Sequence, residues 1–461
     1  MGVAGAVVVP HPPLIMPEIG RGEEKKIQAT IDAYREAMRR MAALSPDTIV
    51  LSSPHATMYA DYFHISPGRR ATGDFGDFRV PQLKLETDYD ADFADMLTRQ
   101  LKAAGVAGGT LAERAPRLDH GTMVPLRYVQ EVMPQVKIVR VGLSGLLPRD
   151  HYRFGECVAQ TAELLGRRVV YVASGDLSHK LKADGPYGFA AEGPVFDKEC
   201  MAALAAGDFL RLLSIDADLA EGAAECGLRS FWMMAGALDR RKVDAEQLSY
   251  EGPFGVGYGV ASFIAGERDG ARAFGDAFVK AQKERLAVRK AAEDEYVRLA
   301  RMSLETFVKT GKHADLPENL PPELSQARAG AFVSLKKDGM LRGCIGTFLP
   351  VTENLGTEIL RNAVAACSED PRFDPVREDE LDALVYSVDV LTEPEPIASD
   401  AELDPKRYGV IVESGDRRGL LLPDLAGVDT VAEQLSIACR KGGIDPNGPV
   451  KLWRFEVTRH H

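Results

Sequence analysis

Three histidines in the first 180 residues each stand directly after a short apolar segment with the composition of a buried β-strand. They are His11 after residues 3–9, His55 after residues 48–51, and His179 after residues 169–173. In an open α/β sheet, ligands bind beyond the carboxyl ends of the strands, so side chains that follow neighbouring strands can converge there. A lone histidine is usually structural, but three at one predicted sheet edge favour a site that binds a metal or moves protons.

The sequence around these histidines suits a rigid site. His11 lies in the motif PHPP, whose prolines restrict φ and stiffen the strand exit, and His55 lies in SSPH. Gly175 and Asp176 precede His179 in the motif SGDLSH. The glycine permits an unusual backbone turn, and the carboxylate could orient an imidazole or cap the next element.

The other histidines divide into one candidate and several structural residues. His120 is a candidate, because an aspartate precedes it and a glycine follows it in LDHGTMVPL. His64 and His151 have no such context, and we expect them to be structural. His460 and His461 end the chain and lie outside the predicted site.

A mononuclear metal site needs a third ligand besides two histidines. Two histidines and one carboxylate form a facial arrangement that leaves positions on iron(II) open for substrate and oxygen. Glu225 is the candidate carboxylate, in the segment AAECGLRS ahead of a predicted apolar helix. A carboxylate at a helix start is equally explained by the helix dipole. Glu251, beside a glycine-rich stretch, is a weaker candidate.

The elements that must position these residues alternate along the chain. Between the apolar segments, amphipathic stretches long enough for helices occupy residues 23–43, 91–104 and 152–165. This order predicts an N-terminal α/β domain over residues 1–265, with a central sheet flanked by helices. The polar, glycine-containing segment 266–275 is the expected junction.

The remainder of the chain has a different pattern. Strand-like segments follow one or two helices and occupy residues 331–335, 340–348, 384–391 and 409–412. We therefore expect a second, smaller α+β domain over residues 280–461.

Composition and charge exclude several classes of protein. The 461 residues are 45% hydrophobic and carry a net charge of −12, which disfavours a nucleic-acid partner because such binding depends on clustered basic residues. The basic cluster at residues 280–290 is interrupted by Glu284 and indicates a solvated helix face. No apolar run reaches the length of a membrane span. The six cysteines form no C-x-x-C pair, which favours a cytoplasmic protein.

The motifs PHPP, SSPH, LDHGTMVPL, SGDLSH and AAECGLRS together resemble those of the class III extradiol dioxygenase (LigB) superfamily and its relative, the Memo family. The resemblance covers most of residues 1–265. It implies that His11 and His55 bind a metal together with a late glutamate. It further implies that His179 acts as acid and base, and that His120 holds or protonates the oxygen-derived species.

The third ligand separates two interpretations of this resemblance. In Memo-like proteins the ligand is a cysteine, which falls here on Cys226, next to Glu225. We prefer Glu225, because a hard carboxylate suits iron(II) and oxygen chemistry. The resemblance then implies an iron(II)-dependent dioxygenase that cleaves or oxidises a catecholic small molecule with O2, with zinc or copper as alternative metals. The alternatives are a non-catalytic Memo-like metal-binding or interaction protein and a zinc hydrolase or lyase.

The second domain resembles the AMMECR family. The resemblance rests on the motif LRGCIGTF at residues 341–348, followed by SEDPRF at 368–373. Arg342 and Cys344 lie two apart on a predicted strand and therefore point to the same face. The arginine could lower the thiol pKa and make the cysteine reactive. A buried structural cysteine is the alternative.

The combination of the two domains resembles the AmmeMemoRadiSam group, in which such domains are associated with a radical SAM protein. It implies a radical SAM partner, and a homo-oligomer is also compatible with the sequence. The chain has no cysteine triplet with iron–sulfur spacing, so it is not expected to be the radical enzyme itself.

Overall fold

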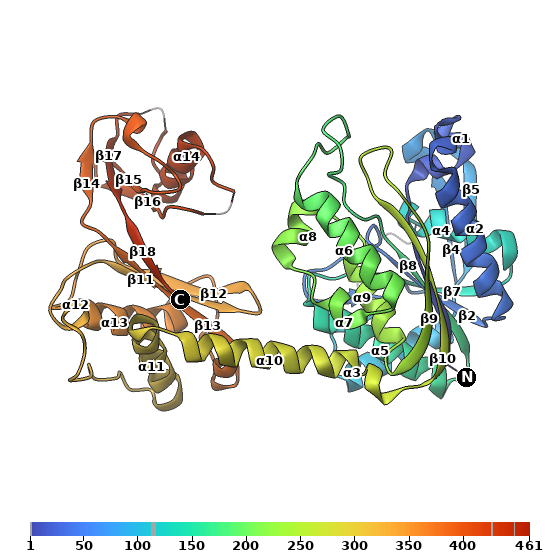
Figure 1. Cartoon of the computed structure of the whole chain (residues 1–461), viewed down its shortest axis with the longest axis horizontal. Helices are drawn as coiled ribbons and strands as arrows, with labels where there is room; N and C mark the ends of the chain where they lie inside the picture. The colour runs from blue at the N-terminus through green and yellow to red at the C-terminus, as the bar shows by residue number, and fades with distance from the viewer. Residues whose placement is uncertain (1, 112–116, 426, 447) are drawn as a thin grey trace. The chain divides into compact units, whose positions relative to one another are not determined.

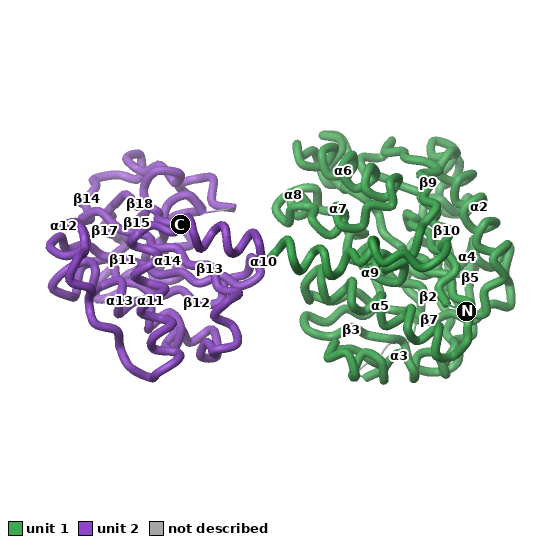
Figure 2. The backbone as a smooth tube through the Cα atoms, turned by 60° about the horizontal axis from the view of Figure 1, so that its bottom comes forward, with its two compact units in different colours: residues 1–282 green, residues 283–461 purple. Residues whose placement is uncertain are grey.

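The computed structural model describes residues 2–111, 117–425, 427–446 and 448–461 (Figure 1). The chain divides into two compact units, residues 1–282 and 283–461 (Figure 2). Each unit has apolar cores of its own. Among the described helices, none combines the length and the apolar character that a membrane crossing requires.

A six-stranded sheet in the order β7-β2-β8-β1-β10-β9 forms the centre of the first unit. Its strands are β1 (Gly2–Val9), β2 (Thr48–Ser53), β7 (Lys137–Gly142), β8 (Arg168–Ser174), β9 (Arg241–Glu251) and β10 (Tyr258–Arg268). The strands β1, β8, β2 and β7 run parallel, whereas β10 and β9 are antiparallel and form one edge. The carboxyl ends of β1, β8 and β2 therefore lie side by side.

Helices cover both faces of this sheet (Figure 1). On one face, α2 (Gln28–Ala43) and α4 (His120–Val132) share an apolar core with the strands. The other core contains residues of α3 (Ala91–Ala103), α5 (Pro148–Leu164), α6 (Glu192–Ala206), α7 (Phe209–Leu213) and α9 (Leu228–Ala237). Val7 and Val8 of β1 belong to opposite cores, as the two-residue period of a strand requires. The predicted α/β architecture is confirmed.

Shorter elements complete the first unit and lead out of it. They are α1 (Pro17–Gly20), β3 (Phe63–His64), β4 (Arg70–Phe75), β5 (Val80–Asp88), β6 (Gly108–Gly109) and α8 (Ala217–Ala223). In the segment 266–275, where we expected the junction, the chain completes β10 and begins α10 (Phe274–Ala292). The boundary between the two compact units falls inside this helix.

The second unit is a mixture of helices and antiparallel sheets, as predicted. One sheet has the order β12-β11-β13-β18 and the other the order β14-β17-β15-β16. The strands are β11 (Ala331–Lys337), β12 (Met340–Gly346), β13 (Leu384–Leu391), β14 (Glu395–Ile397), β15 (Gly409–Ser414), β16 (Arg417–Leu421), β17 (Lys451–Phe455) and β18 (Val457–His460). The helices are α11 (Glu295–Thr310), α12 (Pro322–Ser325), α13 (Leu355–Ser368) and α14 (Val431–Gly442).

Candidate metal centre

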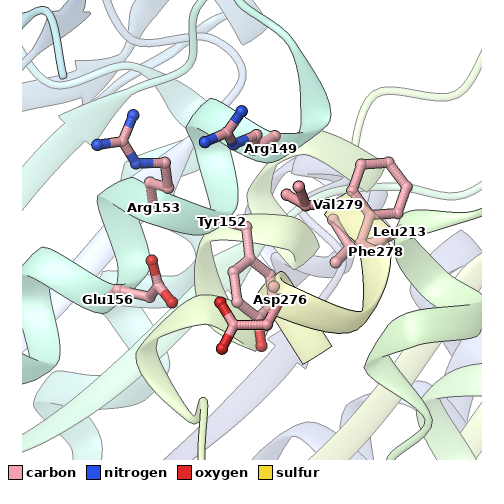
Figure 3. Close-up of a pocket in the computed structure, with 9 residues that line it drawn as sticks. Arg149, Tyr152, Arg153, Glu156, Leu213, Asp276, Phe278 and Val279 are labelled. Atoms are coloured by element: carbon pink, nitrogen blue, oxygen red, sulfur yellow. The ribbon is translucent and has the colours of Figure 1, made fainter. Parts of the chain in front are cut away.

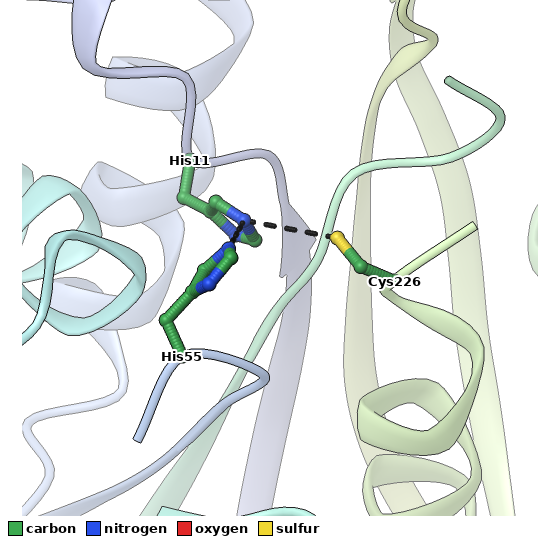
Figure 4. A group of neighbouring side chains, drawn as sticks. All are labelled: His11, His55 and Cys226. Carbon is green, nitrogen blue, oxygen red and sulfur yellow. Dashed lines mark hydrogen bonds between the residues drawn. The ribbon is translucent and has the colours of Figure 1, made fainter. Parts of the chain in front are cut away.

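Two histidines and a cysteine converge in the first unit (Figure 4). Nε2 of His11 lies 3.1 Å from Nε2 of His55 and 3.8 Å from Sγ of Cys226. One potential donor atom from each residue lies within 4.8 Å of the others. His11 is buried, Cys226 is half-buried and His55 is exposed, so solvent reaches the group from the side of His55.

The strand order explains why the two histidines meet. In the sheet, only β8 separates β1 from β2, and all three strands are parallel. The exits of β1 and β2 therefore carry His11 and His55 to the same end of the sheet. The hydroxyl of Tyr34, on α2, donates to the carbonyl of Pro10 at 3.1 Å and holds the His11 exit.

Cys226 reaches the histidines through a close approach of two glycines. It lies between α8 and α9, after Ala224, whose backbone is left-handed with φ of 51°. A Cβ atom on Gly175 would lie 2.1 Å from Cα of Gly227, so the two backbones can touch because neither residue has a side chain. The backbone N–H of Asp176 then donates to Sγ of Cys226 at 3.3 Å.

Asp176 also holds the backbone of the first histidine. Its Oδ1 accepts the backbone N–H of His11 at 2.8 Å, and its Oδ2 lies 4.0 Å from Nε2 of the same residue. Burial raises the pKa of the Asp176 carboxyl, whereas the hydrogen bond from His11 lowers it. The residue thus connects the exits of β1 and β8.

The histidines at this site are held neutral. Burial, reinforced by the charge of His55, lowers the pKa of His11 to about 3. Burial also lowers the pKa of His55, and it lowers the pKa of His120 to about 3. Neutral imidazole is the form that binds a metal, so burial prepares these side chains as ligands rather than as cations.

The distance between the two imidazole nitrogens fits a single metal ion. Two imidazole nitrogens at about 2.0–2.1 Å from one ion lie about 2.8–3.4 Å apart for right-angled to tetrahedral geometry. The 3.1 Å between Nε2 of His11 and Nε2 of His55 falls in this range. Nδ1 of His11 faces Oγ of Ser174 at 3.0 Å, which leaves Nε2 as the nitrogen directed at the group. Two nitrogens and a sulfur can hold zinc, copper or iron.

The structure places Cys226, and not the preferred Glu225, beside the two histidines. The carboxylate of Glu225 instead accepts the backbone N–H of Leu228 at 2.6 Å and caps the start of α9. Burial raises the pKa of Glu225 to about 7. The side chains of Glu225 and Cys226 thus point in different directions, one to the start of α9 and the other to the histidines. The position of the glutamate is explained by its favourable interaction with the N-terminal end of the helix. The weaker candidate Glu251 accepts from the backbone and hydroxyl of Thr30.

His120 lies next to the group. Its ring centroid is 4.0 Å from that of His55 and 5.6 Å from that of His11. It is the first residue of α4, and the ring of Phe78 packs edge-on against it at 5.3 Å. The side chain of Asp119 caps this helix by accepting the backbone N–H of Thr122.

His179 lies on the segment that follows β8. Its Nδ1 is 2.7 Å from the carbonyl oxygen of Ala224, and Tyr187 packs edge-on against its ring at 5.1 Å. A carbonyl cannot donate, so Nδ1 carries the proton and Nε2 presents a lone pair. His179 makes no ring contact with the other three histidines among those that the structure describes.

The expected structural histidines lie outside this group. His151, in α5, is buried, with Nδ1 3.0 Å from the carbonyl of Leu147 and Nε2 accepting the N–H of Ser144. His64, in β3, is fully buried.

In the second unit, Arg342 is engaged away from the cysteine. Its guanidinium donates to both oxygens of Glu380, at 2.9 and 3.0 Å. Cys344 has other partners: Sγ accepts the hydroxyl of Ser334 at 3.1 Å, and its backbone N–H donates to Asp370. The hypothesis that Arg342 activates the thiol therefore has no contact to support it among the described residues.

A small pocket of about 120 Å³ lies in the first unit between α5 and the start of α10 (Figure 3). Its lining includes Arg149, Arg153 and Glu156 on one side and the apolar side chains of Leu213, Phe278 and Val279 on the other. None of the residues that we predicted for the site lines this pocket.

Sequence reasoning missed several residues that hold the histidines in place. They are Ser53, Asp119, Arg140 and Ser174. The serines follow apolar strand segments in the sequence, which is a visible signal. Their partners lie dozens of residues away in the chain, however, and no local pattern identifies them.

Comparison with known proteins agrees with this architecture. Residues 5–261 match the family model of the catalytic LigB subunit of aromatic ring-opening dioxygenase, and residues 297–460 match the AMMECR1 model. A protein of Clostridium acetobutylicum is 42% identical over 468 aligned positions, covering 100% of this chain and 99% of its own. A Thermotoga maritima protein is 55% identical over 170 residues, which are 36% of this chain and 98% of its own.

One solved structure, an uncharacterized protein from Pyrococcus horikoshii, is 36% identical and covers 36% of this chain and 88% of its own, with a TM-score of 0.34. The LigB model spans more than half of the chain, and the Clostridium relative matches it from end to end. The chain therefore belongs to the family of the catalytic LigB subunit of aromatic ring-opening dioxygenase, with an AMMECR1 domain after its LigB domain.

Proposed function

We propose that the first unit binds one divalent metal ion through His11, His55 and Cys226 and uses it to oxidise a small aromatic molecule with O2. The convergence of two neutral Nε2 atoms and one Sγ atom carries this proposal. The family match supports the aromatic substrate class. Catechols are the substrates to test first.

Iron(II) is the metal we propose, with copper and zinc as alternatives. When bound, iron(II) would supply open coordination positions for two substrate oxygens and for dioxygen. In extradiol cleavage, the carbon–carbon bond beside the diol breaks and both atoms of O2 enter the product. The substrate supplies the electrons, so no external reductant is needed.

The chain itself would move the protons. His179, with its proton on Nδ1, presents Nε2 as an acceptor for a substrate hydroxyl proton. His120 is neutral and lies next to His55. It could therefore form a hydrogen bond to the oxygen-derived group during the reaction. Phe78 packs against His120 and limits the orientation of its ring.

A second candidate function is metal binding without oxygenation. The observation in its favour is Cys226, because a thiolate ligand suits copper and zinc better than a carboxylate does. A protein of this kind would bind metal with the same three residues and would consume no oxygen.

The test begins with metal content by mass spectrometry after anaerobic purification. We expect near-stoichiometric iron in the wild type and in Glu225→Ala, and its loss in His55→Ala and Cys226→Ala. Glu225→Ala is the matched control, because it neighbours Cys226 but faces another direction. Retention of metal in Cys226→Ala with loss in Glu225→Ala would overturn the ligand assignment.

Oxygen uptake with a panel of catechols then separates the two functions. Uptake that disappears in His179→Gln while metal content stays constant supports the oxygenase. Copper or zinc at full occupancy, with no uptake across the panel, would reject it in favour of metal binding alone.

A further inference from the structure

We propose that Ser53 and Ser174 are positioning residues, which tether the two metal-binding histidines to the first turn of α4, the turn that carries His120. The proposal rests on the proposed metal site for its functional meaning. Its structural content, two specific hydrogen-bonded links, does not depend on a bound metal.

The first tether runs from His11 through Ser174, the last residue of β8. The hydroxyl of Ser174 donates to the carbonyl of Gly121 at 2.6 Å. A hydroxyl has one hydrogen, so Oγ must act as acceptor toward Nδ1 of His11, 3.0 Å away. Nδ1 therefore carries the ring proton, and Nε2 keeps its lone pair for the metal. Ser174 sets both the tautomer and the ring orientation of His11.

The second tether runs from His55 through Ser53, the last residue of β2. Oγ of Ser53 accepts the backbone N–H of His55 at 3.2 Å and donates to Oδ1 of Asp119 at 2.6 Å. Asp119 immediately precedes His120. Ser53 thus fixes the loop of one histidine to the residue before another.

The turn at the start of α4 is itself firmly anchored. Asp119 accepts the backbone N–H and the hydroxyl of Thr122, at 2.9 and 2.8 Å. Arg140, on β7 and 2% exposed, pairs with Asp119 at 3.1 Å and balances its buried charge. These bonds hold the turn rigidly, so the Ser53 tether ends on a fixed carboxylate and the Ser174 tether ends on the carbonyl of Gly121 in the same turn.

Glycine at position 121 allows the histidines to pack against this turn. A Cβ atom there would lie 2.5 Å from Oγ of Ser53 and 3.1 Å from Cδ2 of His55. The His55 ring and the Ser53 hydroxyl thus lie directly on the helix start. Groups that hydrogen-bond a metal-binding histidine tune its affinity for the ion, and their loss typically costs about 10- to 100-fold.

The first experiment uses metal-free, full-length protein with 15N-labelled histidine. In the wild type we expect Nδ1 of His11 to be protonated and Nε2 to be bare. In Ser174→Ala, the tautomer should shift toward Nε2–H, and in Ser53→Ala the ring signals of His55 should move. Ser52→Ala is the matched control, because Ser52 is the buried neighbour whose hydroxyl contacts Ser230 instead. It should leave both rings unchanged.

A proton on Nε2 of His11 in the wild type, or ring signals unchanged in both tether variants, would overturn the proposal. Should Ser174→Ala fail to fold, as judged by circular dichroism, the Ser53→Ala spectrum decides the Ser53 tether and the wild-type tautomer decides the Ser174 tether.

The second experiment measures binding of cobalt(II) by chelator competition and its d–d spectrum. We expect about 10- to 100-fold weaker binding and an altered spectrum in Ser174→Ala, a smaller loss in Ser53→Ala, and no change in Ser52→Ala. Wild-type affinity and spectrum in both tether variants would contradict a positioning role. If the wild type binds no cobalt, the proposed metal site fails, while the histidine spectra still decide whether the tethers exist.

Discussion

The two units differ in how their polar side chains are arranged. In the first unit, Nε2 of His11, Nε2 of His55 and Sγ of Cys226 converge, and one hydrogen bond from the backbone of Asp176 reaches the sulfur. In the second unit, the charged residues around Cys344 form ion pairs: Arg342 binds Glu380, and Arg372 binds Asp370 and also donates to the carbonyl of Cys344. A reactive residue type alone therefore does not indicate a site. The first unit has a candidate site because several potential metal-ligand atoms converge, whereas the charged side chains near Cys344 mainly pair with one another.

Experiments can separate the two units because each contains one tryptophan. Trp232 lies in α9 and Trp453 in β17. A Trp453→Phe background reports on unfolding of the first unit, and a Trp232→Phe background reports on the second.

The largest effect is expected from breaking the buried ion pair beneath the histidines. Arg140→Met leaves the charge of Asp119 without its partner, which should destabilise the first unit by about 3–5 kcal/mol. Urea unfolding in the Trp453→Phe background measures this loss. The second unit, followed in the Trp232→Phe background, should unfold as before. Equal loss in both units would contradict their independence.

Metal should stabilise only the first unit. At a free metal concentration about 100 times the Kd, linkage predicts a gain of about 2.7 kcal/mol. Thermal or urea unfolding with and without anaerobic iron(II) gives the value, and a chelator should reverse it. The gain should vanish in His55→Ala. A comparable gain reported by Trp453 would indicate a metal site in the second unit and would break the comparison.

The second unit should respond to acid through Glu380. The hydrogen bonds from Arg342 lower the pKa of Glu380 to about 2, so its stabilisation is present above the ordinary pKa of about 4.3 and is lost as the pH falls toward about 2. Glu380→Gln should cost about 2 kcal/mol at pH 7, within the range for hydrogen bonds to charged groups. The difference from wild type should shrink below about pH 4. A difference that is independent of pH down to 2.5 would refute the pairing.

The smallest effect is expected at Cys344. Its thiol accepts a hydrogen bond from Ser334 and also interacts with the guanidinium of Arg372. Cys344→Ser keeps a polar atom at this position, so it should change stability by less than about 1 kcal/mol and leave metal content unchanged. The labelling rate of Cys344 with iodoacetamide should be no faster than that of glutathione. Much faster labelling would show a reactive thiolate and would give the second unit a site of its own.

Much of the first unit could be predicted from the sequence. Apolar segments followed directly by His11 and His55 predicted that both histidines lie at the same edge of the sheet, because parallel strands share one carboxyl end. The proximity of His120 came only from family resemblance, because nothing local in LDHG shows that α4 starts beside β2.

The choice between Glu225 and Cys226 could not be made from the sequence. It depends on a turn in which Ala224 is left-handed, and on the N–H of Asp176, 50 residues earlier, which donates to the sulfur. Hardness of the ligand favoured the glutamate, but the glutamate caps α9 instead. Likewise, the same-face argument for Arg342 and Cys344 could not foresee that Glu380 would occupy the guanidinium.

The contact between Gly175 and Gly227 also bears on folding. Cys226 joins the histidines only after the chain following β8 has closed against the turn before α9, a junction between segments 52 positions apart. The Cys226 sulfur, the proposed third ligand, therefore reaches the histidines through tertiary closure and not through any single strand or helix. Tight metal binding would then report that the first unit has finished folding. A side chain at either glycine would sterically hinder the contact between the two backbones and delay this last step.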